Sequence, residues 1–162
     1  VVSGFVGAQP EGNVRQFVST LLPSEDEAHV ADLLAIGDEP SLVEVLASPS
    51  LFFQDMAGSR LPIAVAHGEG FANFTHRGDP AQAIAAMRYV DNTGAPTEAY
   101  PFNPNGSPGG LTGVTTADGR FTALMPHPER VFRNIQMSWT PGDPSAHSPW
   151  MRIWRNARQW VG

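Results

Sequence analysis

The sequence predicts an α/β fold, because strand-like apolar runs alternate with helix signals along the chain. The runs lie at 41–46, 62–67, 87–90, 112–116 and 120–125, and helix signals begin near Ser24, Ser48, Asp79 and Ser148. The chain has 162 residues, 41% of them hydrophobic, which suffices for one domain of ordinary size with a buried core. Its 16 glycines and 15 prolines indicate many turns and irregular connections.

Residues 1–40 differ in sequence pattern from the rest of the chain. Ser24 and Glu27 have the spacing of a capping box, apolar residues follow at helical spacing, and Gly37 can end that helix. A shorter helix is predicted at 13–21. The segment contains no chemical motif, so it is left as an unassigned segment before a domain at 41–162.

Residues 41–102 carry a series of short elements. A strand is predicted at 41–46, and Ser48-Pro49 opens a helix that runs through Met56 and stops at Gly58. The apolar run 62–67 predicts a buried strand, and Asp79-Pro80 starts a helix to about residue 85. A strand at 87–90, a turn at 91–94 and a returning strand at 99–102 follow.

The last third of the chain begins with a loop at 103–110 that is rich in residues tolerant of positive φ. Its backbone amides could line a site, although most such loops only turn the chain. Residues 112–116 and 120–125 predict a hairpin around 117–119. Ser148-Pro149 opens a terminal helix whose apolar face carries Trp150, Ile153, Trp154, Ala157 and Val161.

Composition excludes several classes of chemistry. A net charge of −6 and a pI of about 5.2 argue against nucleic-acid binding, which needs a basic face. No apolar run approaches the ~20 residues of a membrane span, so a cytoplasmic protein without membrane contact is expected. The chain has no cysteine and no lysine, which removes disulfides, thiol catalysis by this chain alone and lysine Schiff-base chemistry.

Two histidine–carboxylate pairs could carry chemistry, and each follows a strand-like run. They are His67-Gly68-Glu69 and His127-Pro128-Glu129. A histidine beyond a strand can take a proton from a nucleophile and return it to a leaving group. A carboxylate on the other ring nitrogen fixes the tautomer and stabilises the imidazolium. Either pair alone is a weak signal, because ordinary hydrogen bonding explains most such pairs.

A metal site is the rival use of these residues. Two histidines and two carboxylates make a plausible zinc or iron ligand set. Neither pair has the helical spacing of four residues, and Pro128 restricts how His127 and Glu129 could converge on one ion. No metal is therefore predicted, and a His/Glu metal-dependent hydrolase remains the weaker alternative.

Several longer stretches resemble one family. They are Leu61-Pro-Ile-Ala-Val-Ala-His-Gly-Glu-Gly, Tyr100-Pro-Phe-Asn-Pro-Asn-Gly-Ser-Pro, Met125-Pro-His-Pro-Glu-Arg and Pro149-Trp-Met-Arg-Ile-Trp-Arg-Asn-Ala-Arg, with shorter matches at Ser41-Leu-Val-Glu-Val and Arg88-Tyr-Val-Asp-Asn. In this order they resemble the C-terminal part of the glutamine amidotransferase domain of the large form of phosphoribosylformylglycinamidine synthase. That domain is of class I, the type with a catalytic triad, and the resemblance covers about 41–162.

The resemblance implies a fold and a reaction. The fold is a flavodoxin-like open α/β sheet, incomplete here at its N-terminal side. In the family a cysteine attacks the side-chain amide of glutamine, and the ammonia released serves the amidination of formylglycinamide ribonucleotide in purine biosynthesis. The partners are therefore glutamine and the synthetase domains of the same enzyme. ATP and Mg²⁺ belong to that synthetase portion, and no cofactor is expected in this chain.

The resemblance also implies roles for single residues. His127 matches the general base and acid, and Glu129 matches the acid that orients it. His67, Gly68 and Glu69 match a loop that supports the site or contacts substrate. Asn105, Gly106 and Ser107 match a second loop near the site.

One departure from the family limits the expected activity. The family carries a Gly-Val-Cys-Asn-Gly-Cys-Gln nucleophile elbow about forty residues before the counterpart of Ser41, and this chain has no such sequence. A shifted reading frame before about residue 41, or fusion to unrelated sequence, would explain the change. The chain alone is therefore expected to be inactive. A non-catalytic module that docks on a synthetase partner is the main alternative.

Overall fold

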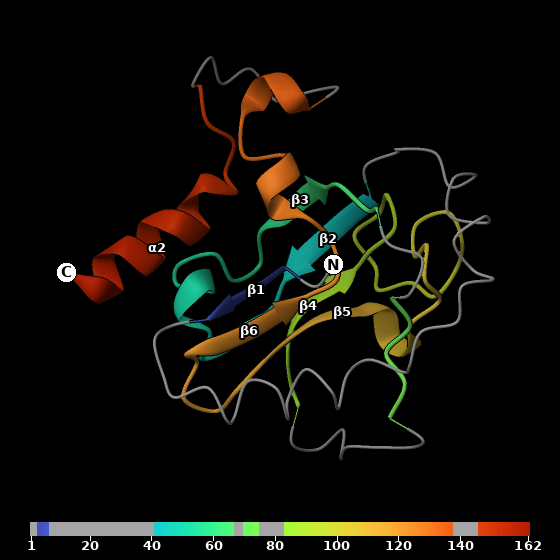
Figure 1. Cartoon of the computed structure of the whole chain (residues 1–162). Helices are drawn as coiled ribbons and strands as arrows, with labels where there is room; N and C mark the ends of the chain where they lie inside the picture. Colours follow the sequence, from blue (N-terminus) through green and yellow to red (C-terminus); the bar gives the residue numbers. More distant parts are fainter. Residues whose placement is uncertain (1–2, 7–40, 67–69, 75–82, 138–145) are drawn as a thin grey trace, which may run out of the picture.

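One open sheet forms the centre of the molecule. The computed structural model describes residues 3–6, 41–66, 70–74, 83–137 and 146–162, and within them the strand order is β1-β6-β5-β4-β2-β3 (Figure 1). Every pair of neighbouring strands in this order is antiparallel. The strands are β1 Ser3–Val6, β2 Ser41–Val45, β3 Arg60–Ile63, β4 Ile84–Tyr89, β5 Leu111–Thr115 and β6 Phe121–Leu124.

The sheet and helix α2, Met151–Val161, confirm the predicted α/β class with an open sheet. The antiparallel pairing of the described strands differs from the parallel pairing of a doubly wound sheet. Residues 1–2 and 7–40, with the helices predicted at 13–21 and from Ser24, lie outside the described residues. In the part of the chain that the structure describes, no helix is both long and apolar enough to cross a lipid bilayer.

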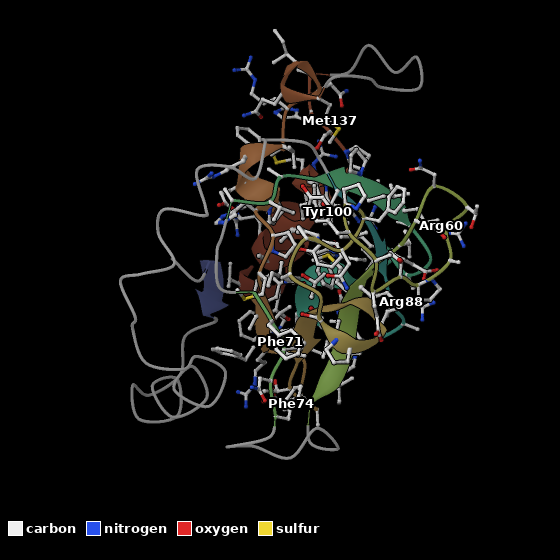
Figure 2. The ribbon with its side chains drawn as sticks, turned by 90° about the vertical axis from the view of Figure 1, so that its right-hand side faces the viewer. Arg60, Phe71, Phe74, Arg88, Tyr100 and Met137 are labelled. Atoms are coloured by element: carbon white, nitrogen blue, oxygen red, sulfur yellow. The ribbon has the colours of Figure 1, made fainter. Side chains whose placement is uncertain are left out.

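Strand β2 shows how the sheet divides its two faces. Ser41, Val43 and Val45 are buried and alternate with half-buried residues, as the two-residue period of a strand requires. On the other face Glu44 lies opposite Arg88 of β4 and Arg60 of β3. Arg88 donates two hydrogen bonds to Glu44, of 2.9 and 2.7 Å, and Arg60 lies 4.0 Å from it (both arginines are labelled in Figure 2). The charge pattern thus fixes the solvent side and the register of three strands.

The predicted hairpin joins β5 and β6, with a turn that requires its glycine. Gly119 has φ +69°, and a Cβ there would collide with the backbone of Pro49. Asp118 accepts hydrogen bonds from the Thr116 hydroxyl at 2.6 Å and from the Arg120 side chain at 2.7 Å. These hydrogen bonds, that from Thr116 most of all, lower the pKa of Asp118 to about 2.

Helix α2 covers the core, as predicted from its apolar face. Trp150, which precedes the helix, and Ile153 are fully buried, whereas Val161 is exposed at the last turn. Asn156 is also buried, and its side-chain amide donates hydrogen bonds to the carbonyls of Phe52 and Gln54, both at 2.9 Å. These bonds fasten α2 to the segment between β2 and β3.

Three element predictions need correction. The helix predicted from Ser48 to Met56 is only a 3₁₀ turn at Leu51–Phe53. The helix predicted to reach residue 85 is wrong at its end, because β4 already begins at Ile84. The returning strand at 99–102 is absent, and the chain instead pairs Val90 with Pro96 before a run of turns. In each case hydrogen bonds to distant strands or turns outweighed weak local preferences.

Candidate active site

His127 lies just beyond the end of β6, in the region where the sequence predicted a site. Its backbone N–H donates to the carbonyl of Ala64 at 2.8 Å, which continues the sheet by one antiparallel bridge past β3. Pro128 then begins a 3₁₀ turn, Pro128–Arg130, in which the Arg130 N–H donates to the His127 carbonyl. The proline suits this place because the first residue of a turn needs no N–H donor.

The imidazole of His127 forms a short hydrogen bond with Glu129. Nδ1 of the ring lies 2.6 Å from Oε1 of the carboxylate. The His127 side chain is 5% exposed and the Glu129 side chain 39% exposed, so the bond lies at the boundary between core and solvent. Since an ionised carboxylate only accepts, Nδ1 carries the proton, and the basic lone pair of the neutral ring lies on Nε2.

Trp150 supports the strand that holds His127. Its indole Nε1–H donates to the carbonyl of Pro62 at 2.7 Å. Two residues after Pro62 stands Ala64, whose carbonyl accepts the N–H of His127. The fully buried indole just before α2 therefore holds β3 next to the residue that binds the histidine backbone.

Ser148 supports the other side of the histidine–carboxylate pair. Its hydroxyl donates to the carbonyl of Val131, and its N–H donates to the carbonyl of Phe132 at 2.8 Å. Val131 follows Glu129 by two residues, and Ser148 is itself buried. Ser148 thus secures the chain after the pair, while Trp150 secures β3 beside it. The sequence indicated Ser148 only as a helix start and Trp150 only as a core residue.

The loop 103–107 contacts the segment that follows His67-Gly68-Glu69. The Asn105 side-chain N–H donates to the Gly70 carbonyl at 2.6 Å, and the Ser107 hydroxyl donates to the same carbonyl at 3.0 Å. Ser107 also accepts the Ala72 N–H at 3.0 Å, and it is fully buried. Both side chains are therefore engaged with the backbone of 70–72, which favours a supporting role.

Gly106 lets the loop turn between these two contacts. It has φ +66° and open space where a side chain would begin. Asn103 completes the loop, since its side-chain amide donates to the carbonyls of Thr97 and Ser107 at 3.0 Å each.

His67, Gly68 and Glu69 lie outside the described residues. Their described neighbours are held on both sides, Ala64 by His127 and Gly70 by Asn105 and Ser107. Among the described residues, His127 and the loop 105–107 thus contact the same stretch of chain, at Ala64 and at Gly70. Among the residues that the structure describes, no group of three histidine, aspartate or glutamate side chains could hold a metal ion.

Comparison with known proteins agrees with the architecture. PurLQS from Thermotoga maritima, a solved structure, has a TM-score of 0.52 to this chain at 21% sequence identity, a level that supports the shared fold. The match covers 76% of this chain and 47% of that chain, so this chain spans about half the length of that relative. The family model of the CobB/CobQ-like glutamine amidotransferase domain matches residues 15–161. This match confirms the predicted amidotransferase fold, and the chain belongs to the CobB/CobQ-like glutamine amidotransferase family.

Proposed function

We propose that this chain is part of the glutaminase domain of a phosphoribosylformylglycinamidine synthase. The observation that carries the proposal is the 2.6 Å bond between His127 and Glu129, in a member of a glutamine amidotransferase family. The domain would release ammonia from glutamine for the amidination of formylglycinamide ribonucleotide in purine biosynthesis. Synthetase domains of the same enzyme would be its partners and would bring ATP and Mg²⁺, and a cytoplasmic location stays a prediction.

His127 is the proposed proton carrier. With its Nδ1–H bound to Glu129, the ring can accept a proton only at Nε2. In the first step Nε2 takes the proton of a thiol as its sulfur attacks the amide carbon of glutamine. The same proton then passes to the nitrogen that leaves as ammonia, and a glutamyl thioester remains. Water, deprotonated by the same ring, hydrolyses the thioester to glutamate.

Glu129 is the proposed orienting acid. The imidazolium formed in each step is stabilised by the carboxylate at 2.6 Å, because the opposite charges lie close together next to buried groups. The carboxylate also keeps the ring in the tautomer that leaves Nε2 basic. An amide in its place would keep the shape of the side chain but lose the charge.

Residues 67–69, Asn105 and Ser107 are proposed as a supporting unit. What supports this is that Asn105 and Ser107 both donate to the carbonyl of Gly70, the first described residue after 67–69. Removing either side chain would therefore act on the backbone at Gly70. Asn105 and Ser107 are therefore positioning residues in this proposal, and His127 and Glu129 are the catalytic pair.

The chain alone is proposed to be inactive, because it holds no cysteine. Without a thiol nucleophile the covalent step disappears, and the base cannot replace it. The purified chain is expected to release no glutamate from glutamine above the level of its His127→Ala variant. Glutamate release that His127→Ala abolishes would overturn this part of the proposal.

A fusion tests the catalytic roles themselves. A segment with the Gly-Val-Cys-Asn-Gly-Cys-Gln elbow, taken from a family member, replaces residues 1–40. The fusion is expected to hydrolyse glutamine, and His127→Ala is expected to lower kcat by about 10²-fold or more. Trp160→Phe, a change at a half-exposed ring near the C-terminus, serves as the control with unchanged kcat. An active fusion that is indifferent to His127→Ala would refute the assignment.

A further inference from the structure

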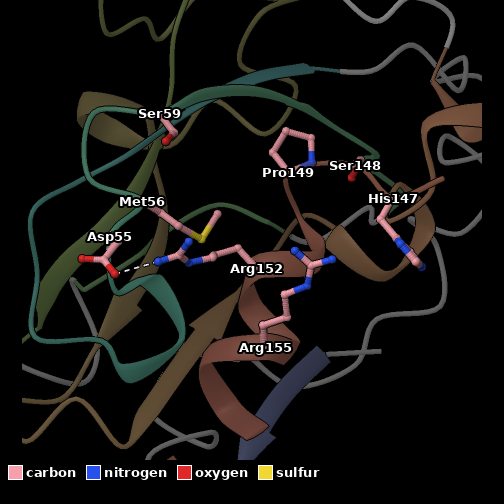
Figure 3. Close-up of a pocket in the computed structure, with 8 residues that line it drawn as sticks. All are labelled: Asp55, Met56, Ser59, His147, Ser148, Pro149, Arg152 and Arg155. Carbon is pink, nitrogen blue, oxygen red and sulfur yellow. Dashed lines mark hydrogen bonds and ion pairs between the residues drawn. The ribbon is translucent and has the colours of Figure 1, made fainter. Parts of the chain in front are cut away.

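A cavity lies at the start of α2, and neither His127 nor Glu129 lines it. Its volume is about 450 Å³, within the range of roughly 300–1,000 Å³ common for ligand pockets. Figure 3 shows the side chains that line it, which come from the segment before β3, from the chain entering α2 and from α2 itself. They are Asp55, Met56, Ser59, His147, Ser148, Pro149, Arg152 and Arg155.

Arginine outnumbers carboxylate in the lining, although the whole protein has a net charge of −6. Arg152 and Arg155 lie three residues apart on α2, so both project from the same side of the helix. His147 adds an imidazole at the opposite wall, and Asp55 is the one carboxylate of the lining (Figure 3). Two guanidinium groups with one carboxylate leave an excess of positive charge in the cavity.

The carboxylate already present can be displaced. Asp55 accepts a hydrogen bond from Arg152 at 2.6 Å, but the Asp55 side chain is 80% exposed and that of Arg152 is 46% exposed. An ion pair with this exposure is weakened by water and by salt. A ligand anion that reached both guanidinium groups would compete with Asp55 for Arg152.

The donors of this cavity are side chains rather than the end of the helix. The first amides of α2 are already bonded, Met151 to the Ser148 carbonyl and Arg152 to the Pro149 carbonyl, both at 3.0 Å. Ser148 is buried and directs its hydroxyl to Val131. Binding must therefore depend on the side chains of Arg152, Arg155 and His147. Mutation of these side chains can test it without altering the backbone of the helix.

We propose that this cavity binds a phosphate-bearing small molecule, with Arg152 and Arg155 contacting the phosphate oxygens. A phosphate monoester carries nearly two negative charges at neutral pH and three acceptor oxygens, which matches two guanidinium groups better than a single carboxylate does. The remaining volume, bounded by Met56 and Pro149, would hold the organic part of the ligand. The proposal is independent of the glutaminase assignment.

The test is a titration of the full chain at constant ionic strength, followed by NMR shifts of the arginine side chains. The probes are inorganic phosphate, ribose 5-phosphate and ribose. Saturable binding of ribose 5-phosphate is expected, tighter than inorganic phosphate, with no binding of ribose. If inorganic phosphate and ribose 5-phosphate bound equally well, the cavity would recognise the phosphate group alone. That result would overturn the claim that it holds the organic part of a ligand.

Three variants give results of different sign. Arg155→Gln is expected to weaken binding about tenfold or more, whereas Asp55→Asn is expected to tighten it several-fold because Arg152 loses its competitor. The matched control is Arg158→Gln, which should leave binding unchanged. Arg158 is an exposed residue of the same helix that does not line the cavity. Equal loss in Arg155→Gln and Arg158→Gln would show attraction by net charge alone and overturn the site. No gain in Asp55→Asn would contradict the competition for Arg152 and would also overturn it.

Discussion

The buried indole of Trp150 offers the sharpest test of how the pair His127–Glu129 is held. Trp150 is completely buried, and its Nε1–H donates to the Pro62 carbonyl at 2.7 Å. The change Trp150→Phe keeps an aromatic ring in the core but removes that donor. It therefore separates the hydrogen bond between α2 and β3 from the general need for an apolar side chain.

The expected cost follows from two losses. The Pro62 carbonyl is only partly buried, and losing its donor costs about 1–3 kcal/mol, with the lower end expected where water can reach the carbonyl. The smaller ring leaves unfilled space in a site with no solvent access, which adds about 1–2 kcal/mol. The free energy of unfolding is therefore expected to fall by about 2–5 kcal/mol, a large share of the stability of an ordinary domain.

Urea unfolding followed by circular dichroism measures this change, with the m-value as a check that the denatured state is unaltered. The matched control is Trp160→Phe at a ring that is 45% exposed, for which a change within about 0.5 kcal/mol is expected. Hydrogen exchange at the His127 amide should also accelerate in Trp150→Phe. The acceptor of that amide, the Ala64 carbonyl, lies two residues after Pro62, so losing the bond to Pro62 should loosen both. Equal effects of the two tryptophan changes would refute the role given to the indole.

Three further predictions concern the pair and the turns. In Glu129→Gln, ¹⁵N NMR of the neutral His127 ring should show the Nδ1–H tautomer losing its dominance, and an unchanged spectrum would remove the orienting role. Asp118 should titrate near pH 2 by carboxyl ¹³C NMR. Because its folded pKa is lowered from 3.8, its contribution to stability is complete above pH 3.8 and is lost as the pH falls toward 2. Gly119→Ala should destabilise the chain by about 2 kcal/mol more than Gly58→Ala, measured by urea unfolding. Both glycines have positive φ, but only the first meets a backbone neighbour, so equal costs would contradict the clash.

Local signals explain which elements the sequence predicted well. The hairpin of β5 and β6 has a glycine turn between two alternating runs, and the residues that its two strands pair with each other are close in the sequence. Strand β2 was recognisable from its alternation, which one buried face enforces. The predicted strand at 99–102 had no such pattern, and the structure places turns there.

In the candidate site, too, contacts between residues close in the sequence were predictable and long-range contacts were not. His127 and Glu129 stand two residues apart, so a sequence can suggest their contact directly. The contacts of Asn105 and Ser107 with Gly70 span 35 and 37 residues, and the bond from Trp150 to Pro62 spans 88. No spacing rule reaches across such distances. Only the resemblance pointed to the loop at 105–107, and nothing in the sequence pointed to Trp150 as a support.

The contacts that hold His127 and Glu129 in place do not involve the thiol that the proposed function requires. The bonds that place His127 and Glu129 come from 62–64, from 131–132 and from the start of α2, all within the C-terminal two thirds of the chain. The geometry of the pair therefore does not depend on a thiol being present. It follows that the contact between His127 and Glu129 can be studied in this chain without a thiol, and that the tautomer of His127 can be measured there directly. In the proposed reaction such preorganisation is what proton transfer would require, because the ring must already be oriented when the sulfur of the nucleophile approaches.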